Sequence, residues 1–263
     1  MRGILLSTFL LIATSIPGLA LGQPAINSEI APTGKLRVAT NGGNTTLVTR
    51  TPDGKVIGGV GVNVGKFIAE KLGGSFELVS YANADAYTQS FGKGEWDIAI
   101  GVSTPLVAEK ADFGPVLMLV DYMYVAAPGR EFANAAQIDR PGVKIAVGRN
   151  SVSDQFLNQT LKSAELVRVP GGVGPGLEAL RSGKADVWAA SSSNVYGVAD
   201  SLPGSKVIPG ALTSEPYTVA LPKGRSSAAQ TKLVEIVNEA KRTGVVRKAI
   251  EQLGVRGIRA APD

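Results

Sequence analysis

Two stretches of the chain follow one pattern: KGEWDIAIGVST at residues 93–104 and SGKADVWAASSS at residues 182–193. In each, a glycine, two further residues and an aspartate precede a run of small or apolar residues, and the stretch ends in hydroxyl side chains. A short apolar run bounded by turn-forming residues is typical of a buried strand. The elements around the two stretches also correspond in order, so the sequence predicts two lobes of similar α/β construction. The likeness is architectural, because one lobe is not a sequence copy of the other.

Short strands alternate with amphipathic helices on both sides of the first stretch. KLRVAT at residues 35–40 and SFELVSY at 75–81 have strand character, and between them Val64, Phe67, Ile68 and Leu72 fall on one face of a helix. A short helix is expected at 86–91. A second series of strand, helix and strand begins with KIAVG at 144–148. This alternation predicts an α/β fold in which each lobe has a mostly parallel sheet flanked by helices.

Two apolar stretches with aromatic residues, at 116–129 and 215–224, flank the second series. Both are too apolar for surface linkers, so we expect the chain to cross from one lobe to the other there and later to return. Helices near the C-terminus would then complete the first lobe. The predicted boundaries are residues 33–122 with 218–263 for lobe 1 and residues 123–217 for lobe 2.

The N-terminal residues 1–22 have the features of a secretory signal peptide. Arg2 precedes an apolar run that is followed by Pro17, Gly18 and further small residues. The apolar run is shorter than the roughly 20 residues that span a bilayer, so we expect cleavage near Gly22 and release into the periplasm. An uncleaved, membrane-anchored form is the alternative.

The composition excludes several classes of function. The net charge is +5, and the lysines and arginines are scattered rather than clustered, so no nucleic-acid partner is expected. The chain has neither histidine nor cysteine. This excludes Ser-His-Asp and Cys-His catalysis and nearly all zinc sites, and we expect no cofactor and no metal.

Polar loops follow the strands at the edge where open α/β sheets bind ligands. The loops lie at residues 41–46, 101–104, 149–153 and 191–194, and all are rich in Asn, Ser, Thr and Gly. If the lobes face each other, these loops line one cleft, and no catalytic residue is assigned there. The candidate ligand-binding residues are Asn41, Asn44, Gly101, Ser103, Thr104, Arg149, Asn150, Ser151 and Ser191.

Some of the loop residues also have a purely structural interpretation. The Ser151 side chain can cap the following helix, although capping is compatible with anion binding at the same helix terminus. Arg149 can be an exposed surface residue. Asp97 and Asp186 precede their strands at the end away from the cleft, which favours structural turns over an acid–base pair.

The chain resembles the bacterial extracellular solute-binding proteins of family 3, the periplasmic receptors of amino-acid ABC transporters. The likeness is carried by DGKVIGGVGVNVGKFIAEKLG at residues 53–73, GKGEWDIAIGVSTPLVAEKADFGP at 92–115, VKIAVGRNSVSDQFL at 143–157 and LEALRSGKADVWAAS at 177–191. The resemblance implies a type 2 periplasmic-binding-protein fold, with two lobes on a two-strand hinge that close over a small ligand. It also implies a membrane permease as partner, and we expect a monomer.

Two positions depart from the family's pattern. Val107 stands where such receptors place an arginine that grips the ligand's carboxylate, and Ser191 stands where they offer an aspartate to its ammonium group. Arg149 is a candidate replacement cation, which would favour a small organic or inorganic anion. The alternatives are an alignment shifted by one residue, or recognition through backbone groups.

The sequence therefore predicts a non-enzymatic receptor for a small polar solute, an amino acid or a related small organic anion. The alternative is an enzyme on the same fold, similar to cyclohexadienyl dehydratases. Such an enzyme needs an acid in the cleft, and among the loops and the helix starts beside them only Asp154 offers a carboxylate. A sensor domain is a third possibility, for which a downstream membrane helix would be expected.

Overall fold

The structure is a computed structural model that describes residues 23–262. The predicted signal peptide at residues 1–22 lies outside the described residues. No helix within residues 23–262 has the length and apolar character needed to cross a membrane.

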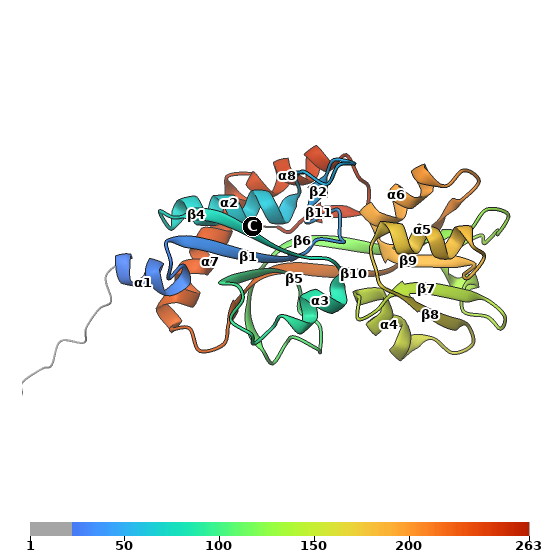
Figure 1. The fold of residues 1–263 in the computed structure, drawn as a ribbon, viewed down its shortest axis with the longest axis horizontal. Coiled ribbons are helices and arrows are strands. Elements are labelled where there is room, and N and C mark those ends of the chain that lie inside the picture. Colours follow the sequence, from blue (N-terminus) through green and yellow to red (C-terminus); the bar gives the residue numbers. More distant parts are fainter. Residues whose placement is uncertain (1–22, 263) are drawn as a thin grey trace, which may run out of the picture.

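Two α/β lobes lie end to end and are joined by two long strands (Figure 1). Lobe 1 contains α1 (Gln23–Ile30), β1 (Lys35–Asn41), β2 (Thr49–Arg50), β3 (Val56–Gly58), α2 (Val60–Lys71), β4 (Ser75–Tyr81), α3 (Ala84–Gln89), β5 (Ile98–Val102), α7 (Ser227–Arg242), α8 (Val245–Leu253) and β11 (Ile258–Ala260). Lobe 2 contains the short 3-10 helix η1 (Ala135–Gln137), β7 (Lys144–Gly148), α4 (Val152–Thr160), β8 (Glu165–Val169), α5 (Val173–Arg181), β9 (Val187–Ser191) and α6 (Ser192–Ser201). The connecting strands are β6 (Ala111–Ala126) and β10 (Lys206–Pro222). Strand β6 overlaps the predicted crossing at 116–129, whereas β10 begins before the predicted return at 215–224. The lobe boundaries stay a prediction.

Nine strands form one continuous sheet in the order β4-β1-β5-β10-β6-β9-β7-β8, with β11 paired to β6, and β2 and β3 form a separate two-stranded sheet. Within each lobe the pairs β1–β4, β1–β5, β7–β8 and β7–β9 are parallel, as predicted. The long strands β6 and β10 run antiparallel to each other, and β10 also pairs antiparallel with β5, as β6 does with β9. The carboxyl ends of the parallel strands in the two lobes therefore point toward each other.

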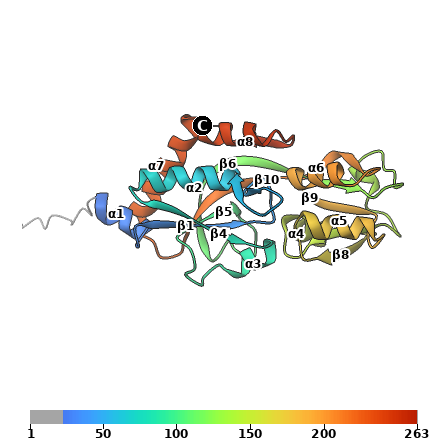
Figure 2. The same cartoon turned by 45° about the horizontal axis from the view of Figure 1, so that its top comes forward.

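Helices cover both faces of each half of the sheet. In lobe 1, α2 and α8 lie on one face and α3 lies on the other (Figure 2). Alternate residues of β1 show this division, because Leu36 and Val38 belong to the large cluster under α2 and α7 while Ala39 belongs to the cluster under α3. In lobe 2, α5 and α6 cover one face and α4 covers the other.

Asp97 and Asp186 have equivalent structural roles in the two lobes. The Asp97 carboxylate accepts hydrogen bonds from the backbone N–H of Arg37 at 2.9 Å and from its guanidinium at 2.7 Å. The Asp186 carboxylate accepts from the backbone N–H of Lys144 at 2.8 Å and pairs with Arg130 at 2.7 Å. Each aspartate thus ties the start of its own strand to a neighbouring strand. The structural interpretation of both residues is confirmed, and neither faces the cleft.

A third segment reaches the junction of the lobes from the C-terminal end of the chain. The carbonyl of Gly257, just before β11, accepts from the backbone N–H of Asp121 at 2.7 Å and from the Ser192 hydroxyl at 3.3 Å. Ser192 begins α6 in lobe 2, so this contact bridges the lobes. Gly257 has φ +79°, and a Cβ there would lie 2.8 Å from the Ser192 Cβ, so the position requires glycine.

Candidate functional site

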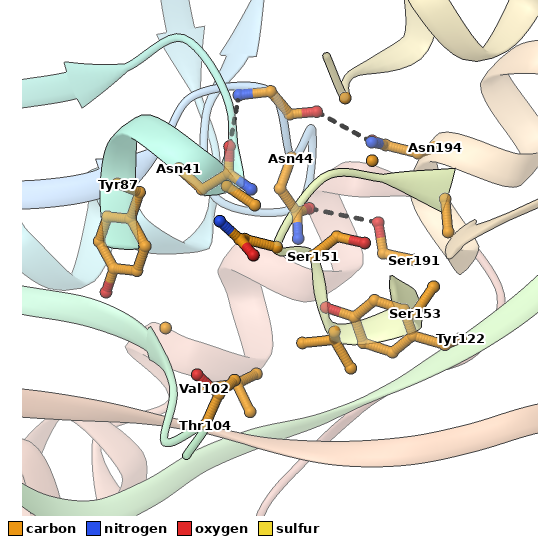
Figure 3. Close-up of a pocket in the computed structure, with 18 of the residues that line it drawn as sticks. Asn41, Asn44, Tyr87, Val102, Thr104, Tyr122, Ser151, Ser153, Ser191 and Asn194 are labelled. Carbon is orange, nitrogen blue, oxygen red and sulfur yellow. Dashed lines mark hydrogen bonds between the residues drawn. The ribbon is translucent and has the colours of Figure 1, made fainter. Parts of the chain in front are cut away.

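A cavity of about 90 Å³ lies between the lobes and is lined by residues of both. A cavity needs roughly 10–15 Å³ to hold one water molecule, so this one has room for a small solute. Figure 3 shows Asn41 and Asn44 from lobe 1 facing Ser151, Ser191 and Asn194 from lobe 2 across this space. The loops predicted from the sequence to meet at one cleft therefore do meet there.

Seven of the nine candidate ligand-binding residues line the cavity: Asn41, Asn44, Gly101, Thr104, Asn150, Ser151 and Ser191. The structure places the other two, Ser103 and Arg149, outside this lining with exposed side chains. Neither is positioned to contact a solute in this arrangement. Arg149 in particular does not supply the replacement cation that the sequence suggested.

A network of uncharged hydrogen bonds joins the first loop of lobe 1 to the start of α6. The Asn194 side chain accepts from the backbone N–H of Thr45 at 3.1 Å and from its hydroxyl at 2.9 Å, and donates to the carbonyl of Gly43 at 2.9 Å. The hydroxyl oxygens of Thr46 and Ser193 are 2.6 Å apart. The lobes are thus in direct contact beside the cavity.

A second contact between the lobes involves the loop before α4. The Asn150 side-chain amide donates to the Asp85 carboxylate of α3 at 2.6 Å. Asn150 has φ +55°, a left-handed conformation that is uncommon for a residue other than glycine. Its backbone N–H donates to Asp154 at 2.9 Å, which stabilises the turn. Strained conformations of this kind gather at ligand sites, where the surrounding structure supports them.

Two tyrosines of the long strands form the wall of the cavity at the hinge. The Tyr122 and Tyr217 hydroxyls are 2.6 Å apart, and the Asn44 amide donates to the Tyr217 hydroxyl at 2.7 Å. Burial raises the pKa of Tyr217 to about 12 and raises the pKa of Tyr122 as well. Both phenols therefore keep their protons at neutral pH and act as hydrogen-bonding groups.

Three polar side-chain atoms at the cavity are buried without a hydrogen-bond partner: the hydroxyl of Tyr87, the hydroxyl of Ser153 and the indole N–H of Trp188. Their residues are 7%, 0% and 1% exposed. An unpartnered buried polar atom costs about 1–3 kcal/mol of stability, so nearly all such atoms in native proteins pair with protein, water or a ligand. Gly101 leaves room for one of them, because a Cβ there would lie 2.7 Å from the Tyr87 hydroxyl.

No residue of the cavity lining is charged. Asp154 is buried close by, but its carboxylate accepts from Asn150 and from the Arg168 guanidinium at 2.8 Å, and it does not line the cavity. Within residues 23–262 no cluster of acidic side chains could hold a metal ion.

The two departures from the family pattern are both at the cavity. Val107 is 1% exposed and packs in the apolar cluster of Tyr87, Phe91 and Trp96. Ser191 is 3% exposed, and its hydroxyl donates to the Asn44 side-chain oxygen at 3.5 Å. The chain therefore has an apolar side chain and a hydroxyl where the resemblance expects two opposite charges.

Several cavity residues were not among the sequence candidates. Tyr87, Tyr122, Trp188 and Tyr217 have the apolar neighbours of core residues in the sequence, which favours core packing for Trp188 and core or hinge packing for Tyr217. Ser153 and Asn194 lie within predicted loops and could have been included on that signal.

No family model matches the chain. A curated relative, the ABC transporter glutamine-binding protein GlnH of Bacillus subtilis, is 22% identical over 185 residues, which cover 69% of this chain and 67% of the relative.

Solved structures share the fold over most of the chain. The solute receptor for L-cysteine of Neisseria gonorrhoeae has a TM-score of 0.74 at 21% identity, covering 86% of this chain and 92% of that one. A mutant of ArgBP from T. maritima has a TM-score of 0.74 at 19% identity, covering 87% and 99%. An ancestral amino-acid-binding protein, AncCDT-1, described as a precursor of cyclohexadienyl dehydratase, has a TM-score of 0.72 at 22% identity, covering 86% and 98%. The predicted two-lobed fold and the similarity to solute-binding proteins of amino-acid ABC transporters are confirmed.

Proposed function

We propose that this protein is the substrate-binding protein of an ABC importer, which captures a small polar solute between its lobes and delivers it to a membrane permease. The observation that carries the proposal is the cavity between the lobes, where buried polar atoms lack partners that a solute would supply. The relatives support it, because their names describe ABC transporter and amino-acid receptors.

The two-strand connection supports a mechanism of opening and closing. Strands β6 and β10 are the principal links between the lobes, and their pairing is irregular between Ile208 and Thr213. Hinges are short segments of this kind, in which a few residues absorb the change in backbone angles. A solute that contacts both lobes stabilises the closed form, and the closed form is what a permease can distinguish.

The proposal includes several predictions that await tests of their own. We assign ligand contacts to the seven cavity-lining candidates, from Asn41 to Ser191, and expect a monomer that is secreted to the periplasm through cleavage of residues 1–22. We also retain the lobe boundaries of residues 33–122 with 218–263 and 123–217.

A thermal-shift screen with amino acids, organic acids and oxyanions tests the function. A bound solute at a hundredfold excess over its dissociation constant stabilises a protein by about 2.7 kcal/mol, which raises the melting temperature measurably. Small-angle scattering on the same sample, with and without the solute, should show a smaller radius of gyration when it is bound. The absence of any stabilising compound would count against the proposal.

An enzyme on the same fold is the second candidate, because one structural neighbour is a precursor of cyclohexadienyl dehydratase. General acid catalysis needs an acid within hydrogen-bond reach of the reacting group. The cavity lining has no carboxylate, which favours binding without chemistry. Incubation with prephenate or arogenate separates the two functions, since only the enzyme would form an aromatic product.

A further inference from the structure

The cavity has hydrogen-bond donors but no charged side chain, and this restricts the kind of solute it can hold. A zwitterionic amino acid brings an ammonium group that needs a carboxylate or several acceptors when it is buried. Two carboxylates beside the lining are already engaged, Asp154 with Arg168 and Asp85 with Asn150. Neither of them lines the cavity.

The three unpartnered atoms favour a solute that accepts hydrogen bonds, whereas an ammonium group can only donate them. The indole N–H of Trp188 can only donate a hydrogen bond. The hydroxyls of Tyr87 and Ser153 can also donate. A solute that accepts hydrogen bonds from all three atoms would present acceptor oxygens to them.

The starts of three lobe 2 helices add a positive potential at the same place. Residues before or within the first turns of α4, α5 and α6 line the cavity, among them Ser151, Ser153, Gly172 and Ser191. Helix N-termini carry free N–H groups and a partial positive charge, and each favours an anion by about 0.3–1 kcal/mol. The unpartnered Ser153 hydroxyl lies in the first turn of α4 and is fully buried, so it is a side-chain donor at this helix terminus. The backbone N–H of Asp154 in the same turn already donates to the Ser151 hydroxyl at 3.2 Å.

The remaining walls are apolar. Leu47, Val102, Val107 and Val152 line the cavity together with the aromatic rings. A dianion would find no compensating charge among these groups, whereas a single carboxylate with a hydrocarbon body would match both the donors and the apolar walls.

We propose that the solute is a small monocarboxylate without an amino group, held at its carboxylate by Tyr87, Ser153, Trp188 and the N-terminus of α4. This inference rests on the proposed receptor function and names the chemical class of its solute. It differs from the amino-acid ligands named for the structural neighbours.

Calorimetry with matched compounds tests the inference. Straight and branched monocarboxylates of three to six carbons are each compared with the corresponding 2-amino acid and the corresponding amide. We expect at least one carboxylate to bind about tenfold more tightly than both of its counterparts, a difference of about 1.4 kcal/mol. Tighter binding of the amino acid or of the amide, or no binding of any carboxylate, would overturn the inference. The receptor function would survive if another class of solute stabilised the protein in the thermal-shift screen.

The unpartnered atoms supply a second, independent test. In Tyr87→Phe and Ser153→Ala, an atom without a partner is removed, so the melting temperature of the unliganded protein should stay the same or rise. Affinity for the carboxylate should fall about tenfold. Tyr124→Phe is the matched control, because Tyr124 is 3% exposed in the core of lobe 2 and does not line the cavity. A fall in stability without loss of affinity in the two cavity variants would contradict the inference.

Discussion

The hydroxyl oxygens of Thr46 in lobe 1 and Ser193 in lobe 2 lie 2.6 Å apart, and both residues are buried. This contact joins the lobes without charge, as do those of Asn194 with Gly43 and Thr45. The closed arrangement therefore has favourable contacts of its own, separate from those of any solute. Each net hydrogen bond contributes about 0.5–1.5 kcal/mol, so together they bias the equilibrium between open and closed forms.

Removal of this contact should favour the open form. In Ser193→Ala the Thr46 hydroxyl loses its partner in the closed form but can bind water in the open form, so the ratio of open to closed protein should rise about two- to tenfold. Small-angle scattering should show a larger radius of gyration without solute, and affinity should fall by up to the same factor. Thr160→Val, an exposed change on α4, is the control and should alter neither quantity. An unchanged radius in Ser193→Ala would mean that the contact does not bias closure.

Gly257→Ala should also disturb the junction of the lobes. The alanine would have to adopt an unfavourable positive φ, and its Cβ would lie 2.8 Å from the Ser192 Cβ of α6. We expect the free energy of unfolding to fall by about 1–3 kcal/mol and the cleft to open. Chemical denaturation measures the first effect and scattering the second.

Gly254→Ala is the matched control for this change. Gly254 has φ +61°, but an added Cβ would have no neighbour within 4 Å, so only the backbone strain is introduced. The difference between the two variants isolates the contact with lobe 2. Equal losses of stability, with no opening in either, would show that Gly257 is needed only for its backbone conformation.

The two equivalent aspartates should differ in their contribution to stability. The Asp97 side chain is fully buried against Arg37, whose pKa is raised chiefly by their hydrogen bond. Asp97→Asn leaves the guanidinium without its counter-charge, and loss of one partner of a buried pair costs about 3–5 kcal/mol. Asp186→Asn should cost about 1 kcal/mol, because its partner Arg130 is 61% exposed and solvent screens the pair. Denaturation of both variants, at neutral pH, checks the order, and a larger loss in Asp186→Asn would contradict it.

The sequence predicts the fold well because the fold depends on patterns that repeat along the chain. Asp97 and Asp186 precede equivalent strands, and the polar loops after those strands do line one cavity. The short helix predicted at 86–91 begins at Ala84 instead, because the Asn83 side chain accepts from the backbone N–H of Ala86 and caps it earlier.

The chemistry of the site is less predictable, because side-chain direction decides it. Arg149 lies in a predicted loop, yet the left-handed turn at Asn150 leaves the arginine exposed. Tyr87 and Trp188 have the neighbours of core residues. Whether a buried hydroxyl or indole N–H has a hydrogen-bond partner depends on atoms from segments distant in the sequence. A local sequence pattern therefore cannot predict it.

The buried tyrosines predict a loss of stability at alkaline pH. Burial raises the pKa of Tyr217 to about 12, and it raises the pKa values of Tyr87 and Tyr122 as well. In the unfolded chain a tyrosine ionises near pH 10. Above that pH the unfolded state has released protons that the folded state still holds, so rising pH favours unfolding. The free energy of unfolding should fall by about 1.4 kcal/mol per pH unit for each such tyrosine, until the pH reaches its folded pKa. Denaturant titrations above pH 10 measure how the free energy of unfolding falls with pH. In Tyr217→Phe this fall should be smaller by about 1.4 kcal/mol per pH unit between about pH 10 and 12.

Near-ultraviolet absorption should show these buried phenols ionising only as the protein unfolds. Their reversible ionisation in the folded protein near pH 10 would contradict the buried arrangement.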